Sequence, residues 1–408
     1  DWCTTAKTSP FTATSGSGFF VNTTSGSVTV TLPASPSAGD IVSISDYANT
    51  FQTNSVTIGR NSSKINGACT DASLNTEGEA VTLVYVDGTR GWKQVNDATL
   101  NVTGTPAYVI ATGGTETTCG NFKIHTFTAD GPFNITNAGQ PSGSNKIEYM
   151  VVAGGGGGGS AAGGGGGGAG GYRESSGVTA GCYSVSPLGA CVSALTASVA
   201  TFSITVGAGG TAGSGSKGGS GATSTFSTIS SAGGGGGSGN CQDAVAGGSG
   251  GGGGFRPPNS PASGAAGNTP PVSPPQGNPG GDTNPSTSNP DRGGGGGGAT
   301  VAGTTPSGNP AGPGGAGATS SINTTPTIRA GGGGGGKDED SPNGGTSGDG
   351  GPGGGGQGSS SDAASLRPGT AGSVNTGGGG GGGGAGPGAG PDGYAGGSGI
   401  VILRYKFQ

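Results

Sequence analysis

Uninterrupted runs of glycine constrain this chain more than any other feature of its sequence. The runs occupy residues 154–159, 163–168, 233–237, 250–254, 293–298, 331–336, 353–356 and 377–384. Glycine has no Cβ atom and loses more conformational freedom on ordering than any other residue. An isolated glycine run therefore cannot order itself. The runs either order one another or serve as flexible linkers.

A bundle of extended rods fits the recurring length of the runs. The threefold extended helix has no internal hydrogen bonds and rises about 3.1 Å per residue, so a six-residue rod would be about 19 Å long. Its N–H and C=O groups point sideways and need partners, which neighbouring glycine rods can supply. We therefore predict a polyglycine II bundle over residues 154–398. Flexible linkers remain the alternative: they explain 104 glycines and 26 prolines but not the similar run lengths. Collagen is excluded because it needs glycine at every third position.

The first 96 residues have the pattern of a small all-β module of sandwich or barrel type. Apolar and polar residues alternate with a period of two, which is typical of half-buried strands. Asp87 and Gly88 form a turn pair suited to a hairpin between the last two strands. The expected strands are residues 19–21, 27–32, 40–46, 55–59, 80–86 and 91–95.

A linker at residues 97–120 is expected to lead to a second β segment. Its expected strands are residues 121–129, 132–137 and 146–153, and another strand is expected at 201–206. The apolar C-terminal segment 399–407 also fits a strand and needs a partner for its backbone groups. We therefore predict that residues 121–153 and 399–408 form one base sheet, which the glycine region leaves and rejoins.

The sequence predicts a mainly β fold with almost no α-helix, because a sustained 3.6-residue period is absent. It also has no apolar run of about 18 residues, the length that would predict a membrane-spanning helix. The first residue is Asp1 rather than methionine. The chain is therefore expected to be a processed product or part of a longer one.

The sequence offers little chemistry for catalysis, so we expect a protein that is not an enzyme and uses no cofactor. His125 is the single histidine, and its alternating surroundings indicate an ordinary strand residue. Residues 331–336 followed by Lys337 imitate a phosphate-binding loop, but Asp338 replaces the required Ser or Thr. The six cysteines lack the spacing of a metal site, so no metal is expected. Cys182 and Cys191 are the most plausible disulfide pair.

Aromatic and charged residues between the runs are the candidates for contact with a receptor. Aromatic and arginine side chains are favoured as binding anchors, although packing under loops or capping of rod ends is the alternative role. Lys337 to Asp340 form the one dense charge cluster, interpreted as a solvated loop tip or, alternatively, a cation or receptor site. The candidates are Tyr172, Arg173, Tyr183, Phe255, Arg256, Lys337, Asp338, Glu339 and Asp340. A net charge of −5 with scattered basic residues argues against nucleic acid as a partner.

The order of motifs along the second half resembles the glycine-rich domain of bacteriophage tail proteins. The motifs are IEYMVVAG at 147–154, GGYRE at 170–174, SITVGAGG at 203–210, STFSTISSAG at 224–233 and the closing strand at 399–405. The first module, with TLPASPSAGD at 31–40, IGRN at 58–61, LVY at 83–85 and GWK at 91–93, resembles a β module of fibre-like proteins from marine phages.

This resemblance implies a function in attachment. The glycine region is similar in kind to the tip adhesin of T-even-type long tail fibres, in which a sandwich of glycine helices presents variable loops to a host receptor. The implied protein is a fibre or adhesin on the virion surface. Its expected partners are other virion proteins, bound through the N-terminal module, and a host glycan or outer-membrane protein, with a homotrimer as a candidate assembly. A purely structural subunit of a capsid fibre, decoration or filament is the alternative.

Overall fold

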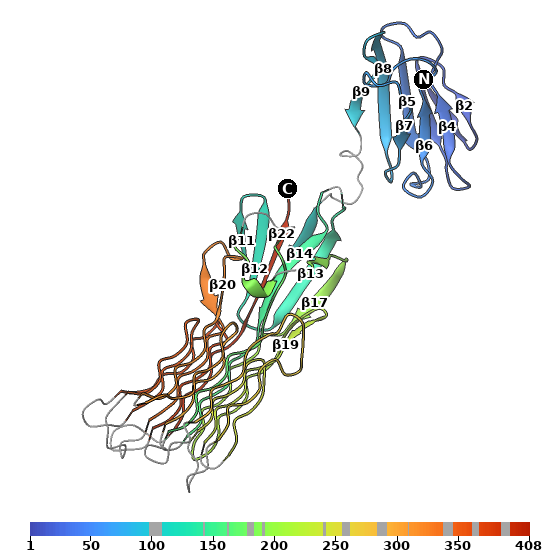
Figure 1. Cartoon of the computed structure of the whole chain (residues 1–408). Coiled ribbons are helices and arrows are strands. Elements are labelled where there is room, and N and C mark those ends of the chain that lie inside the picture. The colour runs from blue at the N-terminus through green and yellow to red at the C-terminus, as the bar shows by residue number, and fades with distance from the viewer. Residues whose placement is uncertain are drawn as a thin grey trace. The chain divides into compact units, whose positions relative to one another are not determined.

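The computed structural model divides into two compact units, Asp1–Thr105 and Pro106–Gln408 (Figure 1). Both are built almost entirely from strands and extended chain, as the sequence predicts. Among the described residues the one helical element is a 3-10 turn at Pro187–Gly189, and none of their helices has the length and apolarity needed to cross a membrane. The structure describes residues 1–97, 108–141, 143–160, 163–177, 183–189, 192–239, 242–254, 262–283, 292–308, 310–337, 346–360, 367–384 and 392–408.

The first unit is a sandwich of two sheets, with strand orders β1-β3-β5-β8-β9 and β2-β4-β6-β7. From β1 to β6 the chain passes alternately from one sheet to the other. The strands β1, β3 and β5 are therefore parallel neighbours, and so are β2, β4 and β6. The strands are β1 Trp2–Lys7, β2 Phe11–Thr12, β3 Ser17–Val21, β4 Val28–Thr31, β5 Ile41–Asp46, β6 Val56–Gly59, β7 Ala72–Leu74, β8 Ala80–Asp87 and β9 Gly91–Asp97.

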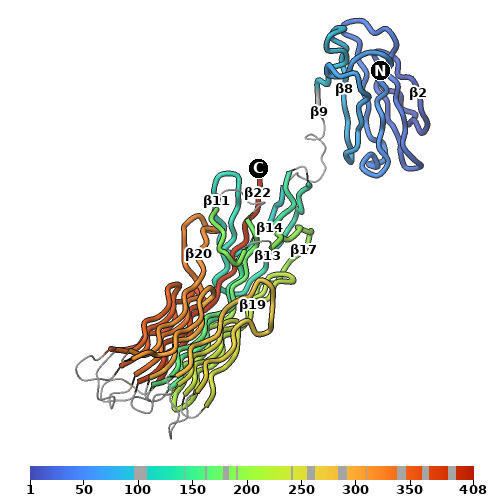
Figure 2. Tube along the Cα trace, in the orientation of Figure 1, coloured from blue at the N-terminus to red at the C-terminus, as the bar shows by residue number. Residues whose placement is uncertain are grey.

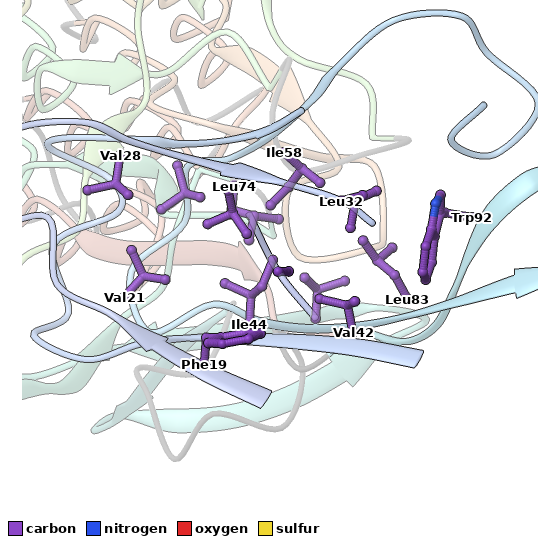
Figure 3. Close-up of a cluster of buried hydrophobic side chains, with 14 of the residues drawn as sticks. Phe19, Val21, Val28, Leu32, Val42, Ile44, Ile58, Leu74, Leu83 and Trp92 are labelled. Atoms are coloured by element: carbon purple, nitrogen blue, oxygen red, sulfur yellow. The ribbon is translucent and has the colours of Figure 1, made fainter. Parts of the chain in front are cut away.

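The two sheets of the first unit enclose a continuous apolar core. Phe19, Val42, Ile58 and Trp92 are among its buried side chains (Figure 3). The predicted hairpin is present: β8 pairs antiparallel with β9, and the Asp87 carboxylate accepts N–H bonds from the turn. The sequence did not predict β1, β2 or β7, because these strands expose one or both faces and lack a clean alternation.

The second unit has strands at one end, which we call the base. A sheet of order β11-β12-β22-β14-β15, with β16 paired to β14, packs against the sheet β10-β13-β17. The strands are β10 Val109–Thr112, β11 Thr115–Cys119, β12 Phe122–Phe127, β13 Gly131–Ala138, β14 Lys146–Val152, β15 Tyr172–Glu174, β16 Leu195–Thr196, β17 Ala200–Ile204 and β22 Ile400–Lys406. Two hairpins complete it: β18 Ser224–Phe226 with β19 Ile229–Ser231, and β20 Ala318–Ser320 with β21 Thr327–Arg329.

The C-terminal strand is at the centre of the base. β22 pairs antiparallel with β14 on one side and with β12 on the other, so the predicted pairing of the two apolar segments is confirmed. The predicted linker 97–120 extended too far, since β10 and β11 lie inside it. β11 has a polar, threonine-rich sequence, and four of its five residues are exposed, so it lacks the apolar alternation of a half-buried strand. β10 does alternate, but it is only four residues long.

Hydrogen bonds show that the glycine runs are threefold helices. In rod 154–159 the N–H groups of Gly154 and Gly157 bond to one neighbour, residues 219–222. Those of Gly155 and Gly158 bond to a second, residues 394–397, and those of Gly156 and Gly159 to a third, residues 165–168. Every third residue thus faces the same rod, which is the geometry of polyglycine II. Figure 2 shows these rods running side by side below the base.

The all-glycine rods form a hexagonal lattice around the rod 163–168. This central rod donates N–H bonds to three rods and accepts them through its carbonyl groups from three others. Each of these surrounding rods also bonds to the next, so the ring closes. In order around the ring, the rods are residues 154–159, 233–237, 250–254, 293–298, 331–336 and 377–384.

Many segments predicted to be connecting loops are rods of an outer layer. Residues 207–213 bond to rod 154–159 through Gly210 and Gly213. Gly207, Gly210 and Gly213 are buried, whereas Ala208, Thr211 and Ala212 are exposed. An outer rod needs glycine only where it faces the lattice, so its sequence carries no uninterrupted run. Conversely, the run 353–356 opens in a turn, with φ of 107° and 91° at Gly353 and Gly354.

Steric crowding explains the all-glycine sequence of the inner rods. A methyl group at Gly156 would overlap the carbonyl of Gly235, and one at Gly165 would overlap the carbonyl of Gly252. None of the glycines at 154–159 or 164–168 has a positive φ, so an L-residue could adopt the backbone conformation. The lattice therefore requires glycine for its missing Cβ and not for its conformational freedom.

Candidate functional site

The rods end opposite the base at what we call the distal end, where Ser160, Gly254, Arg292, Lys337 and Gly384 terminate inner rods. Between Gly207 and Ser398, charged side chains lie mostly there. Of the described charged residues between Gly207 and Ser398, all except Arg329 lie in the distal half of their segment: Lys217, Asp243, Asp282, Arg292, Lys337, Asp349, Arg367 and Asp392. The inner rods themselves offer only backbone.

Two basic residues are buried at the distal end. Arg292 is 2 % exposed and Lys337 is fully buried. Each is attached directly to a glycine run, and the two backbones meet in an isolated bridge because their rods are antiparallel neighbours. The guanidinium of Arg292 donates to the Gly308 carbonyl. Lys337 therefore caps a rod, which corrects its assignment to a solvated loop tip.

A partly exposed ion pair lies beside these caps. The Arg367 guanidinium contacts the Asp349 carboxylate at 2.6 Å and donates to the Ser347 carbonyl. The backbone of Arg367 pairs with Ser360, which in turn bridges to Lys337. An exposed pair of this kind contributes little to stability, typically 0–1 kcal/mol, so its charges are available to an external partner.

Three of the predicted contact residues lie at the base instead. Tyr172 is 1 % exposed because β15 pairs with β14, so the structure gives it a packing role. Arg173 is half-buried on the same strand. The ring of Tyr183 lies against the guanidinium of Arg404, 5.2 Å from the ring centroid. These residues lie where rods return to the base. Because antiparallel rods have connections at both ends of the bundle, some of the candidates had to lie there.

A buried hydrogen-bond network surrounds Tyr172. The Glu174 carboxylate accepts bonds from the Tyr172 hydroxyl (2.9 Å), the Ser320 hydroxyl (2.5 Å) and the Ser186 N–H (3.0 Å). Burial raises the pKa of Glu174 above its ordinary value, against these stabilising bonds. Ser320 belongs to the hairpin β20–β21, so this network fastens that hairpin to the base.

The remaining candidates, Phe255, Arg256, Asp338, Glu339 and Asp340, lie outside the described residues, as do Cys182 and Cys191. Arg292, Asp349 and Arg367 did not figure among the sequence candidates. A usable signal was present for Arg292, because it adjoins the start of a glycine run and so had to lie at a rod end.

His125 is buried in the base and held on both ring nitrogens. Nδ1 lies 2.7 Å from the Gly113 carbonyl and Nε2 lies 3.0 Å from the Tyr405 hydroxyl. Because a carbonyl only accepts, Nδ1 carries the proton. Nε2 then accepts from the Tyr405 hydroxyl, whose other acceptor, the Ala111 carbonyl, is farther away at 3.4 Å. Burial lowers the pKa of His125, although the Gly113 carbonyl and Glu116 act in the opposite direction.

The buried imidazole predicts acid sensitivity of the second unit. Above the unfolded pKa of about 6.5 both states are neutral. As the pH falls below it, the unfolded chain binds a proton that the folded state resists, and stability falls by at most about 1.4 kcal/mol per pH unit. Urea unfolding between pH 7.5 and 5.5 should show this loss.

A His125→Gln variant is the control, because an amide can bond to both partners without titrating. Protonation of Glu174, whose pKa is raised, shifts stability in the opposite direction and is common to both proteins. If the free energy of unfolding of the two proteins depended on pH in the same way, His125 would not be the source of the acid sensitivity.

The sequence of the second unit matches a known family. Residues 127–406 match the family described as glycine-rich domain. The chain belongs to this family. The match extends from the last residue of β12 to the last residue of β22, so the glycine-rich domain includes most of the base together with all of the rods. No curated protein matches the chain.

Proposed function

We propose that this protein is a non-enzymatic bacteriophage virion fibre that attaches to a host receptor through the distal end of its glycine-rich domain. The placement of nearly all described charged side chains of the rod region at that end supports the proposal most directly. Recognition requires side chains, and the inner rods have none. A lattice whose rods are held to one another by backbone hydrogen bonds is also a rigid support on which distal residues can vary without disturbing it.

The order of motifs shared with phage tail proteins supports the placement on a virion. In this proposal the N-terminal sandwich joins the glycine-rich domain to other virion proteins. The receptor is a glycan or protein of the bacterial outer surface.

Cell binding by paired variants tests the proposal. The labelled full chain is added to a panel of bacterial strains. The distal variant replaces Lys217, Asp349 and Arg367 by alanine. The control replaces Glu116 and Lys123, a partly exposed ion pair at the base. We expect the distal variant to lose binding to the strains that the wild type binds, and the control to retain it.

Two results would count against attachment. One is equal binding by both variants, and the other is a wild-type chain that binds no strain in the panel. Immunogold labelling of intact particles would then test the alternative function, that of a purely structural subunit. Regular labelling over a capsid or along a filament, and not at the tail periphery, identifies a structural subunit.

A further inference from the structure

We propose that the first unit carries its own glycan-binding platform, built from Trp2 on the outer face of the sheet β1-β3-β5-β8-β9. This site is separate from the distal end of the glycine-rich domain and does not depend on the function proposed for that end. The expected ligand is a neutral, β-linked pyranose chain. Of the two tryptophans in the chain, Trp92 is fully buried and Trp2 is 49 % exposed.

The indole of Trp2 lies flat on the sheet because its cross-strand neighbour is a glycine. Trp2 pairs with Gly18 in the parallel register of β1 and β3. A Cβ atom at Gly18 would lie 2.5–2.8 Å from three indole atoms, Cδ2, Cε2 and Cε3. The three nearest atoms are the two ring-fusion atoms and one neighbour, all at similar distances, which is possible only for a position above the ring plane. One face of the indole therefore covers Gly18, and the opposite face is directed away from the sheet.

Other side chains border this platform. Phe20, two residues along β3, lies on the same face, with its ring centroid 5.0 Å from that of Trp2 and its plane tilted by 35°. Ser43 and Thr82 continue the row that begins with Trp2 and Gly18, and their hydroxyls bond to each other at 2.9 Å. Ser45 stands opposite Phe20 in the next strand. A flat aromatic surface is thus flanked by a second ring and by a row of hydroxyls.

This combination selects a sugar by its chemistry. The face of an aromatic ring carries negative charge in its quadrupole. A β-pyranose with equatorial hydroxyls presents on each face a set of axial C–H bonds, whose hydrogens carry partial positive charge. The sugar ring can therefore stack on the indole while its equatorial hydroxyls bond to the serine and threonine side chains at its edge. Because the serine and threonine hydroxyls are uncharged, the ligand is expected to be a neutral sugar.

Fluorescence of the full chain provides the test. In a Trp92→Phe variant all tryptophan emission comes from Trp2. We expect saturable quenching or a blue shift with one or more of the hexasaccharides cellohexaose, laminarihexaose and chitohexaose. Maltohexaose, whose α-linkages curve the chain, is the comparison sugar. Calorimetry of the wild type should give the same affinity, and Trp2→Ala should weaken binding at least ten-fold.

A second measurement needs no substitution. The bound hexasaccharide should protect Trp2 of the wild type from oxidation by N-bromosuccinimide, as followed by mass spectrometry of the N-terminal peptide. Because this measurement uses the wild-type protein, it tests the proposal even if the Trp2→Ala variant fails to fold. The proposal is overturned if none of the β-linked sugars changes the emission or protects Trp2. It is also overturned if a folded Trp2→Ala protein binds as tightly as the wild type, which would leave the indole only the role of covering Gly18.

Discussion

Replacing Gly165 by valine is expected to unfold the glycine-rich domain. Gly165 lies in the central rod, where its N–H and C=O both bond to inner rods and an added Cβ would overlap the carbonyl of Gly252. Overpacking a core that can relax costs about 1–3 kcal/mol. Here the obstacle is the backbone of a neighbouring rod, so relief requires breaking hydrogen bonds between rods of the lattice. A loss of at least about 3 kcal/mol is therefore expected.

The matched control is Ala212→Val on the outer rod 207–213. Ala212 is exposed, so the same branched side chain projects into solvent. Denaturant unfolding, with limited proteolysis as a second probe, should separate the two variants clearly. A Gly165→Val protein with wild-type stability would show that the rods are not packed as described.

Removing residues 400–408 is expected to be as damaging as the change in the central rod. These residues include β22, which lies between β12 and β14. Ile400, Val401, Ile402 and Leu403 are all buried. Burying one such side chain contributes about 1.5–3 kcal/mol, so their sum is comparable with the 5–15 kcal/mol of a whole domain. The deletion also exposes two strand edges.

Pulse proteolysis of the full chain and the truncated chain should reveal this difference. We expect rapid digestion of residues 108–399 while the first unit survives as a protected fragment. Truncation of Gln408 alone, an exposed residue beyond β22, is the control and should leave the digestion unchanged. Equal protection of the two truncations would mean that the base does not close the glycine-rich domain.

Features of the site that depend on neighbouring residues in the sequence could be predicted, whereas features that depend on contacts between distant segments could not. That Lys337 adjoins a glycine run was visible in the sequence, but its burial depends on Arg292 and Ser360, which other rods bring beside it. Tyr172 looked like an exposed anchor because glycines precede it, yet the three residues of β15 extend the base sheet. The Glu174 network was invisible, since its donors come from segments as distant as Ser320.

The glycine runs by themselves determined that the inner rods form, because a chain without Cβ atoms can satisfy its buried backbone only against similar segments. The apolar pattern likewise determined that residues 146–152 and 400–406 are strands, and that each requires a partner strand for its backbone hydrogen bonds. Only the tertiary structure decided that the rod 163–168 is central, since all the inner runs have the same composition and their order in the lattice depends on the connections between them. The tertiary structure also decided that segments such as 207–213 are rods. A position in a rod can carry a side chain only where no other rod lies beside it, and the sequence does not show where the neighbouring rods are.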